Sequence, residues 1–187
     1  YNGIAAPPPD AEAKRASRER LRDYAETLTG VRPDYVFTHV TRLVTSKGLW
    51  RDLRVLEELD PLLAEAGRSA VYFVLATAPP AGRRAEDILA MEAEYGWPAK
   101  HRQGEPDLVG AEVPLYEAIE ALNARTRSVK TVFVNQFGWD RERCGRRMPE
   151  GMSFPDIRRG SDLEFGQSIY EPFGIAQVEP LPYGALC

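Results

Sequence analysis

Two carboxylates near the end of the sequence flank a turn-like segment and could bind one ligand together. Glu171 and Glu179 are separated by seven residues, and Gly174 lies between them. If a helix begins near Gly174, Glu171 precedes its positive end and Glu179 lies roughly 8 Å further along the axis. The backbone amides of Phe173, Gly174 and Ile175 would then face an anion. This spacing fits an elongated ligand, with a sugar on one carboxylate, phosphates on the amides and a ribose on the other carboxylate.

A basic segment earlier in the chain could bind the same kind of anion. Arg42 and Lys47 belong to residues 41–49, Thr-Arg-Leu-Val-Thr-Ser-Lys-Gly-Leu, which follow a predicted strand and lead into a predicted helix. The guanidinium group can form two parallel hydrogen bonds to a diphosphate, while the lysine supplies a compact charge. A basic pair at a strand end is, on its own, more often a solvated surface feature than a phosphate site.

Taken together, these segments resemble the C-terminal lobe of the retaining glycosyltransferases with the two-lobed GT-B fold, in the group similar to glycogen synthase and sucrose synthase (family 4). Arg42 with Lys47 and the glycine after it is similar to their diphosphate clamp. Residues 168–174, Ser-Ile-Tyr-Glu-Pro-Phe-Gly, continuing to Glu179, resemble their Ser-x-x-Glu-x-Phe-Gly…Glu signature. The Asn-Gly pair at residues 2–3 resembles the turn that begins their second lobe. The resemblance covers essentially the whole chain.

The resemblance implies transfer of a sugar from a UDP-, ADP- or GDP-sugar to an acceptor, with retention at the anomeric carbon and without a metal or another cofactor. By this analogy, Arg42 and Lys47 neutralise the departing diphosphate, a kind of electrostatic stabilisation worth about 3 kcal/mol per donor. Glu171 would hold the hydroxyls of the donor sugar and Glu179 those of the ribose. The nucleobase would lie near residues 151–153.

The remaining predicted ligand contacts surround these groups. They are Ser168, Phe173, Gly174, Ile175 and Met152.

The helices and strands predicted around these residues alternate along the chain. Short apolar or β-branched runs predict strands at residues 35–40, 71–75, 130–135 and 162–165. Helical spacing predicts helices at residues 10–28, 53–67, 86–95, 114–123 and from about 174 onward. This alternation predicts an α/β fold: a doubly wound, Rossmann-like parallel sheet with helices on both faces and ligands beyond the carboxyl ends of its strands.

The final predicted helix departs from the family pattern. Pro180 and Pro182 occupy positions where the family prefers residues that form helices well. A proline inside a helix removes a hydrogen bond and costs about 3 kcal/mol. We therefore expect this helix to be short or kinked.

The domain organisation expected from the resemblance is that of a fragment. Residues 1–9, with three consecutive prolines, are typical of a stiff linker and would be the hinge from a missing N-terminal acceptor lobe. Residues 10–187 would form the donor-binding domain, truncated at its C-terminus. We expect such a fragment to bind nucleotide but to transfer sugar poorly.

The composition argues against several other partners. The formal net charge is −4, which indicates neither nucleic-acid binding nor membrane association, and no apolar run approaches the roughly 18 residues of a membrane span. Two cysteines form no disulfide framework, so we expect a cytoplasmic setting. Three alternatives remain open: a sugar-nucleotide epimerase, a phosphorylase of the same architecture, and a non-catalytic nucleotide-binding or interaction module.

Several other polar or aromatic residues are expected to be structural. His39 is predicted to be a core histidine, and the Arg158-Arg159 pair to be a solvated surface. Phe133, Phe137 and Trp139 are predicted to lie in the core or at a lobe interface. Cys144, close to several arginines, is a candidate for a lowered pKa.

Overall fold

Four parallel strands form the central sheet, in the order β3-β2-β1-β4. The computed structural model describes residues 10–99, 107–170 and 174–187. The strands are β1 (Tyr35–Val40), β2 (Ala70–Leu75), β3 (Val129–Val134) and β4 (Leu163–Glu164). β1 pairs with β2 along all six residues, whereas β4 adds a short parallel pairing to the other side of β1. The predicted doubly wound α/β fold is therefore confirmed.

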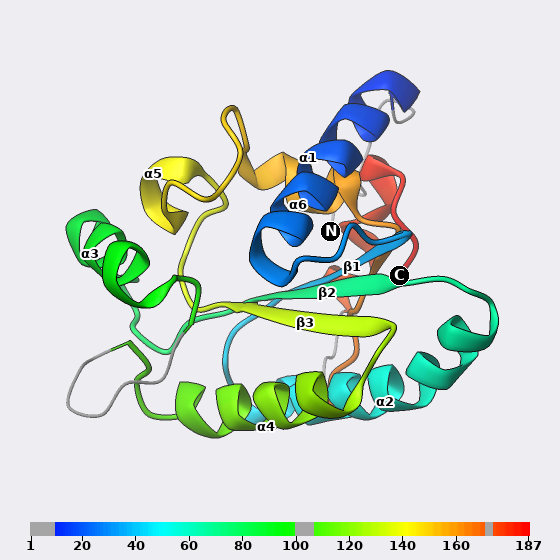
Figure 1. Cartoon of the computed structure of the whole chain (residues 1–187), viewed down its shortest axis with the longest axis horizontal. Coiled ribbons are helices and arrows are strands. Elements are labelled where there is room, and N and C mark those ends of the chain that lie inside the picture. Colours follow the sequence, from blue (N-terminus) through cyan, green and yellow to red (C-terminus); the bar gives the residue numbers. More distant parts are fainter. Residues whose placement is uncertain (1–9, 100–106, 171–173) are drawn as a thin grey trace.

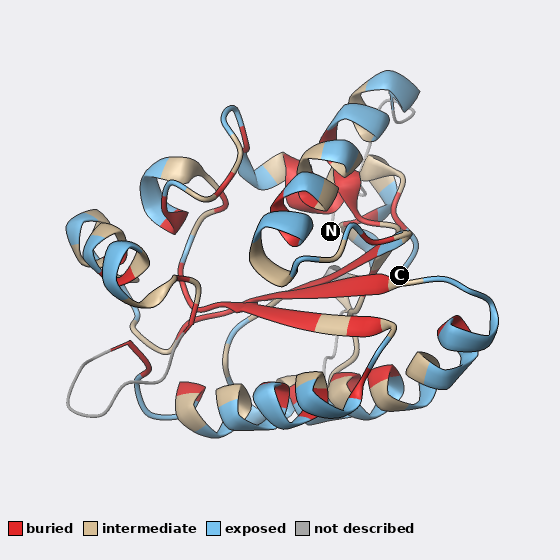
Figure 2. Ribbon diagram, viewed as in Figure 1, coloured by how far each residue is buried: buried red, intermediate tan, exposed pale blue. Residues whose placement is uncertain are grey.

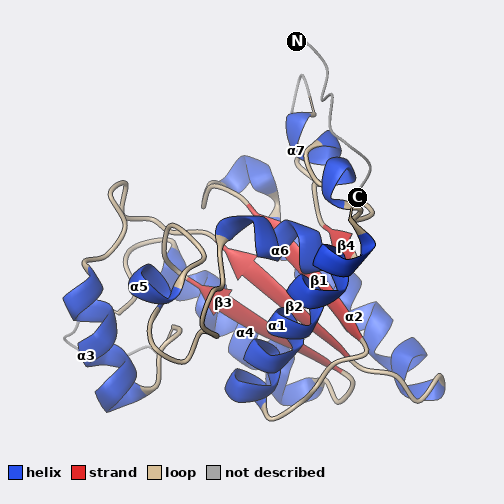
Figure 3. Cartoon of the chain, turned by 90° about the horizontal axis from the view of Figure 1, so that it is seen from above, coloured by secondary structure: helices blue, strands red, loops and turns tan. Residues whose placement is uncertain are grey.

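Helices cover both faces of this sheet (Figure 1). The α-helices are α1 (Ala11–Thr29), α2 (Leu49–Glu65), α3 (Ala85–Tyr95), α4 (Glu112–Arg125), α5 (Arg141–Cys144), α6 (Phe154–Gly160) and α7 (Ile175–Val178). The short 3-10 helices are η1 (Thr45–Lys47) and η2 (Leu181–Tyr183). α2 and α4 pack on one face, and α1 and α6 pack on the other. Seen from above, α3 and α5 lie beyond the ends of β2 and β3, while α7 lies on the β4 side (Figure 3).

Local sequence signals explain where the longer elements begin and end. The side chain of Asp10 caps α1 by accepting a hydrogen bond from the backbone N–H of Glu12, and Gly30 ends this helix in the left-handed conformation. β2 is buried at all six positions, as expected for an apolar strand with helices on both faces. The buried residues form two main clusters, one on each face of the sheet (Figure 2).

The helix after residue 174 is short, as Pro180 and Pro182 predict. α7 has only four residues, and Pro180 then begins the 3-10 helix η2. Proline has no backbone N–H and disfavours helical geometry in the residue before it, which explains the early end. Leu186 then forms a parallel bridge with Leu163 of β4, so the last residues lie alongside the edge of the sheet.

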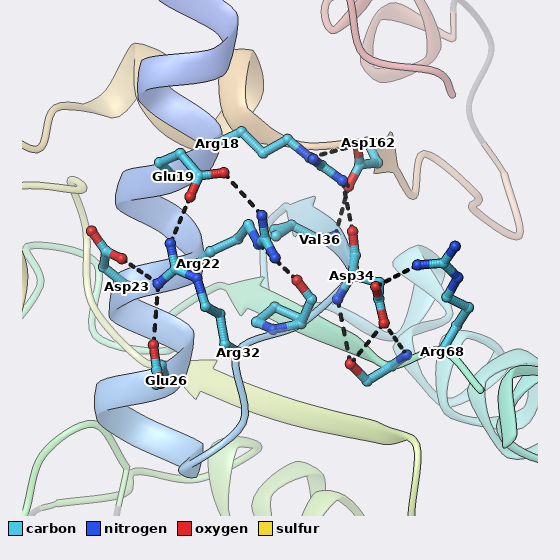
Figure 4. A network of polar contacts seen from close by, with 12 residues as sticks. Arg18, Glu19, Arg22, Asp23, Glu26, Arg32, Asp34, Val36, Arg68 and Asp162 are labelled. Atoms are coloured by element: carbon cyan, nitrogen blue, oxygen red, sulfur yellow. Dashed lines mark hydrogen bonds and ion pairs between the residues drawn. The ribbon is translucent and has the colours of Figure 1, made fainter.

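A polar network surrounds the amino ends of the strands (Figure 4). Asp162 accepts a hydrogen bond from the backbone N–H of Val36 at 2.8 Å and forms an ion pair with Arg18 of α1. Arg32 forms ion pairs with three carboxylates of α1, those of Glu19, Asp23 and Glu26. These contacts align β4 with β1 and attach α1 to the start of β1.

Within the described part of the chain, no helix combines the length and apolar character needed to cross a bilayer.

Candidate functional site

The strand order reverses between β1 and β4, and we call the region beyond the carboxyl ends of these two strands the crevice. From β1 the sheet grows through β2 and β3 in one direction, and β4 is added on the opposite side of β1. In doubly wound sheets, ligands bind where the strand order reverses in this way. The segments that leave these two strands are residues 41–48 and 165–170, which contain several of the predicted site residues.

These two segments are in direct contact. The backbone N–H of Ile169 donates a hydrogen bond to the carbonyl oxygen of Ser46 at 2.7 Å. The side chain of Ile169 also lies 3.7 Å from the position that a Cβ atom at Gly48 would occupy. Residues more than 120 positions apart in the sequence therefore form one surface at the edge of the sheet.

Arg42 and Lys47 lie in the first of these segments, directly before α2. Arg42 is exposed, and Lys47 is partly buried at the end of η1. Gly48 adopts the left-handed conformation with a φ of 60°, and α2 begins at the next residue. The amino end of this 17-residue helix has no side-chain cap and carries a partial positive charge. The cationic pair therefore lies beside a helix end that also favours anions.

The helix end that the sequence analysis predicts to bind an anion belongs to a much shorter helix than α2. We expected it at Gly174, where the structure begins only the four-residue α7. A helix this short aligns few peptide dipoles, so its end contributes much less than that of α2. Gly174 itself has a φ of 58°, which a residue with a side chain rarely adopts.

A buried carboxylate, that of Asp52, attaches the segment after β4 to the neighbouring elements. Asp52 of α2 is fully buried and accepts hydrogen bonds from the Tyr72 hydroxyl at 2.5 Å and from the Gln167 side chain. It also bonds Nδ1 of His39 at 2.6 Å. Gln167 belongs to the segment after β4, so Asp52 links that segment to β1, β2 and α2. His39 is a buried, partnered core histidine, as expected.

The structure places the other predicted site residues unevenly. Ser168 is half-buried beside the contact between the two segments. Met152 packs in the core on the α1 face with 4% of its surface exposed, which leaves only its main chain for ligand contact. Ile175 begins α7. Glu171 and Phe173 lie outside the described residues, so their predicted roles stay predictions.

Glu179 does not occupy the position predicted for it. It follows the last residue of α7 in a turn instead of lying inside the predicted helix, and Glu171 lies outside the described residues. Its Oε2 atom accepts a hydrogen bond from Nη1 of Arg158 at 2.8 Å. The carboxylate remains partly exposed, with 41% of the side-chain surface accessible.

Arg158 is the residue that the sequence interpretation misjudged most. A solvated surface was expected, but only 10% of its side chain is exposed. Its guanidinium group also faces Glu164 of β4 at 3.4 Å, and Glu164 is buried. Burial raises the pKa of Glu164 to about 7; Arg158 opposes this shift and Glu179 adds to it. A glutamate inside a strand was the one signal in the sequence for this cluster.

A second buried ion pair holds the neighbouring strand ends. The Arg83 guanidinium group bonds the buried Glu112 at the start of α4 and the carbonyl oxygen of Asn135 after β3. Burial alone would raise the pKa of Glu112, but hydrogen bonds from Arg83 and two backbone N–H groups leave it lowered. This network is structural: it fixes the loops after β2 and β3.

The cavities of the structure differ in whether residues near the predicted site line them. A cavity of about 240 Å³ is lined by Glu164, Gln177 and residues 165–167, the first residues of the segment that contains Ser168. A larger cavity of about 440 Å³ lies beside β3 and contains none of the predicted site residues in its lining. Volume alone therefore does not identify the site.

Two further chemistries can be addressed from the described residues. Burial raises the pKa of Cys144 to about 12, which corrects the prediction of a lowered pKa. Among the residues that the structure describes, no three His, Cys, Asp or Glu side chains are grouped to hold a metal ion.

The sequence matches no known protein-family profile, and no curated protein matches it.

Proposed function

We propose that this chain is the donor-binding domain of a retaining glycosyltransferase, which transfers a sugar from a nucleoside diphosphate sugar to an acceptor. The observation that carries the proposal is the contact between Ser46 and Ile169 at the crevice between β1 and β4. It brings the segment of Arg42 and Lys47 beside the segment that contains Ser168. The same two segments carry the resemblance to the GT-B enzymes.

The chemistry of this crevice suits a pyrophosphate. Arg42 and Lys47 supply two positive charges, and the uncapped amino end of α2, which begins two residues after Lys47, adds a partial positive charge. When the glycosidic bond to the diphosphate breaks, negative charge develops on the leaving group. Fixed cations and amides stabilise that charge in the transition state. Glu171 would hold the donor sugar, and the partly exposed Glu179 the ribose.

Isothermal titration with UDP, ADP and GDP tests the proposal. We expect one of these nucleotides to bind, and Arg42→Ala and Lys47→Ala each to weaken it by about 10- to 100-fold, as for the loss of a hydrogen bond to a charged group.

Arg125→Ala is the matched control. Arg125 is an exposed arginine at the end of α4. Since β3 begins four residues later, Arg125 lies near the amino end of that strand and not near the proposed site. Its substitution should leave the affinity unchanged. Absence of binding by all three nucleotides, or binding that is insensitive to Arg42 and Lys47, would refute the proposal and favour an interaction module.

A further inference from the structure

The guanidinium group of Arg158 lies between two carboxylates from different parts of the chain. Nη1 donates to Oε2 of Glu179 at 2.8 Å, and Nη2 faces Oε1 of Glu164 at 3.4 Å. The guanidinium carbon also lies 5.7 Å from the centre of the Phe154 ring. A planar guanidinium group held on three sides has little freedom to change its direction.

One of these two carboxylates, that of Glu164, belongs to a strand of the sheet. Glu164 belongs to β4 and is 1% exposed. Among the described residues, its Oε2 atom has no hydrogen-bond partner, so Arg158 is the cation that compensates its charge. If Arg158 moved away, the charge of Glu164 would be buried without a partner, which is costly. This cost favours the observed position of Arg158.

The other carboxylate is the one assigned to the ribose. Glu179 accepts the hydrogen bond from Arg158 with Oε2, and 41% of its side-chain surface stays accessible, which leaves Oε1 for another donor. An ionised carboxylate can only accept hydrogen bonds, so the available oxygen suits a hydroxyl donor. Because Glu179 lies in a turn rather than in a helix, its own backbone offers limited support for a fixed side-chain direction.

We propose that Arg158, held by Glu164, is the positioning residue that presents Glu179 to the ribose hydroxyls and makes the site select ribonucleotides over deoxyribonucleotides. The inference rests on the proposed function, since it needs a nucleotide in the crevice. It adds two residues, on α6 and β4, that the sequence resemblance does not include.

The test compares UDP, ADP or GDP, whichever binds, with its 2′-deoxy and 3′-deoxy counterparts by isothermal titration. For the wild-type chain we expect the ribonucleotide to bind at least about tenfold more tightly than one of them, the size of a hydrogen bond to a charged group. Glu179→Gln and Arg158→Met should both reduce this ratio to less than about threefold. Arg159→Met, a neighbouring arginine on α6, should leave it unchanged.

Arg158→Lys provides a second variant in case the methionine variant does not fold. A lysine retains the charge but cannot hold two carboxylates in a planar fork, so the ratio should fall at least about threefold. A ratio equal to wild type in the folded Arg158 variants would overturn the inference, even if the affinities for both nucleotides fell equally. If binding depends on Arg42 but this ratio does not depend on Arg158, the proposed function stands and only this inference fails. If no nucleotide binds the wild-type chain, both fail.

Discussion

Glu164 has a buried carboxylate of which one oxygen atom faces a cation. One oxygen faces Arg158 at 3.4 Å, and the other has no partner among the described residues. Because burial disfavours the charged form, the pKa of Glu164 is raised from 4.5 to about 7. The folded chain therefore binds this proton more tightly than the unfolded chain does. Its contribution to stability is present below pH 4.5 and is lost as the pH rises through 7.

Substitution of this residue makes the effect measurable. Glu164→Gln removes the titration, so the unfolding free energy of the variant relative to wild type should increase by about 3 kcal/mol between pH 4.5 and pH 8. Urea unfolding at a series of pH values measures this difference. Glu117→Gln, at an exposed position on α4, should show no such trend. A flat difference for Glu164→Gln would mean that its carboxylate is not perturbed.

The elements around the crevice are held together by Asp52. This residue lies in the first turns of α2, yet its partners belong to β1, β2 and the segment after β4. The carboxyl ends of the strands are thus connected through one buried acceptor. Only the hydrogen bond from Gln167 reaches the segment that carries Ser168. That bond should therefore affect ligand binding more than the others do.

Two substitutions separate these roles. Gln167→Met and Tyr72→Phe each remove one hydrogen bond to Asp52 and should each lower the unfolding free energy by about 1–3 kcal/mol. Only Gln167→Met should also weaken nucleoside diphosphate binding, by about tenfold, because it detaches the segment after β4. Urea unfolding and titration calorimetry measure the two effects. Equal affinities for the two variants would show that Asp52 supports the fold alone.

The fold could be predicted because most of its helices and strands have clear local sequence patterns. β2 is a continuous apolar run, and α1 begins at a capping aspartate and ends at a glycine. β4 is harder to predict because its two residues include a glutamate. Phe137 was expected to be in the core or at an interface; 47% of its surface is exposed in this structure.

The candidate site was only partly predictable for a physical reason. The sequence located the segments of Arg42 and Ser168, since each follows a strand. It missed Arg158, because its partners lie 6 and 21 positions further along the chain. Whether an arginine is solvated or buried depends on such distant contacts, which local patterns do not contain. Pro180 and Pro182 predicted a short or kinked helix, but they did not define its last residue, which is Val178, so Glu179 falls just outside it.

At the scale of the whole molecule, we expect ligand binding to be confined to the carboxyl ends of β1 and β4. The amino-terminal edge is occupied by structural networks, such as those of Arg32 and Asp162 (Figure 4). The ends of β2 and β3 are occupied by the Arg83 and Glu112 pair. The crevice between β1 and β4 instead offers Arg42 and the amino end of α2. In a chain of net charge −4, this local positive region should attract an anionic ligand at short range.

The most direct test is a titration of the ¹⁵N-labelled chain with UDP, ADP and GDP, followed by amide chemical shifts. We expect the largest shifts to occur together at residues 42–48 and 168–170, since both segments would contact the same diphosphate. Amides at the opposite edge, at residues 34, 69 and 128, should not move. Shifts confined to one of the two segments, or centred on the opposite edge, would contradict the claim that these segments form a single nucleotide site.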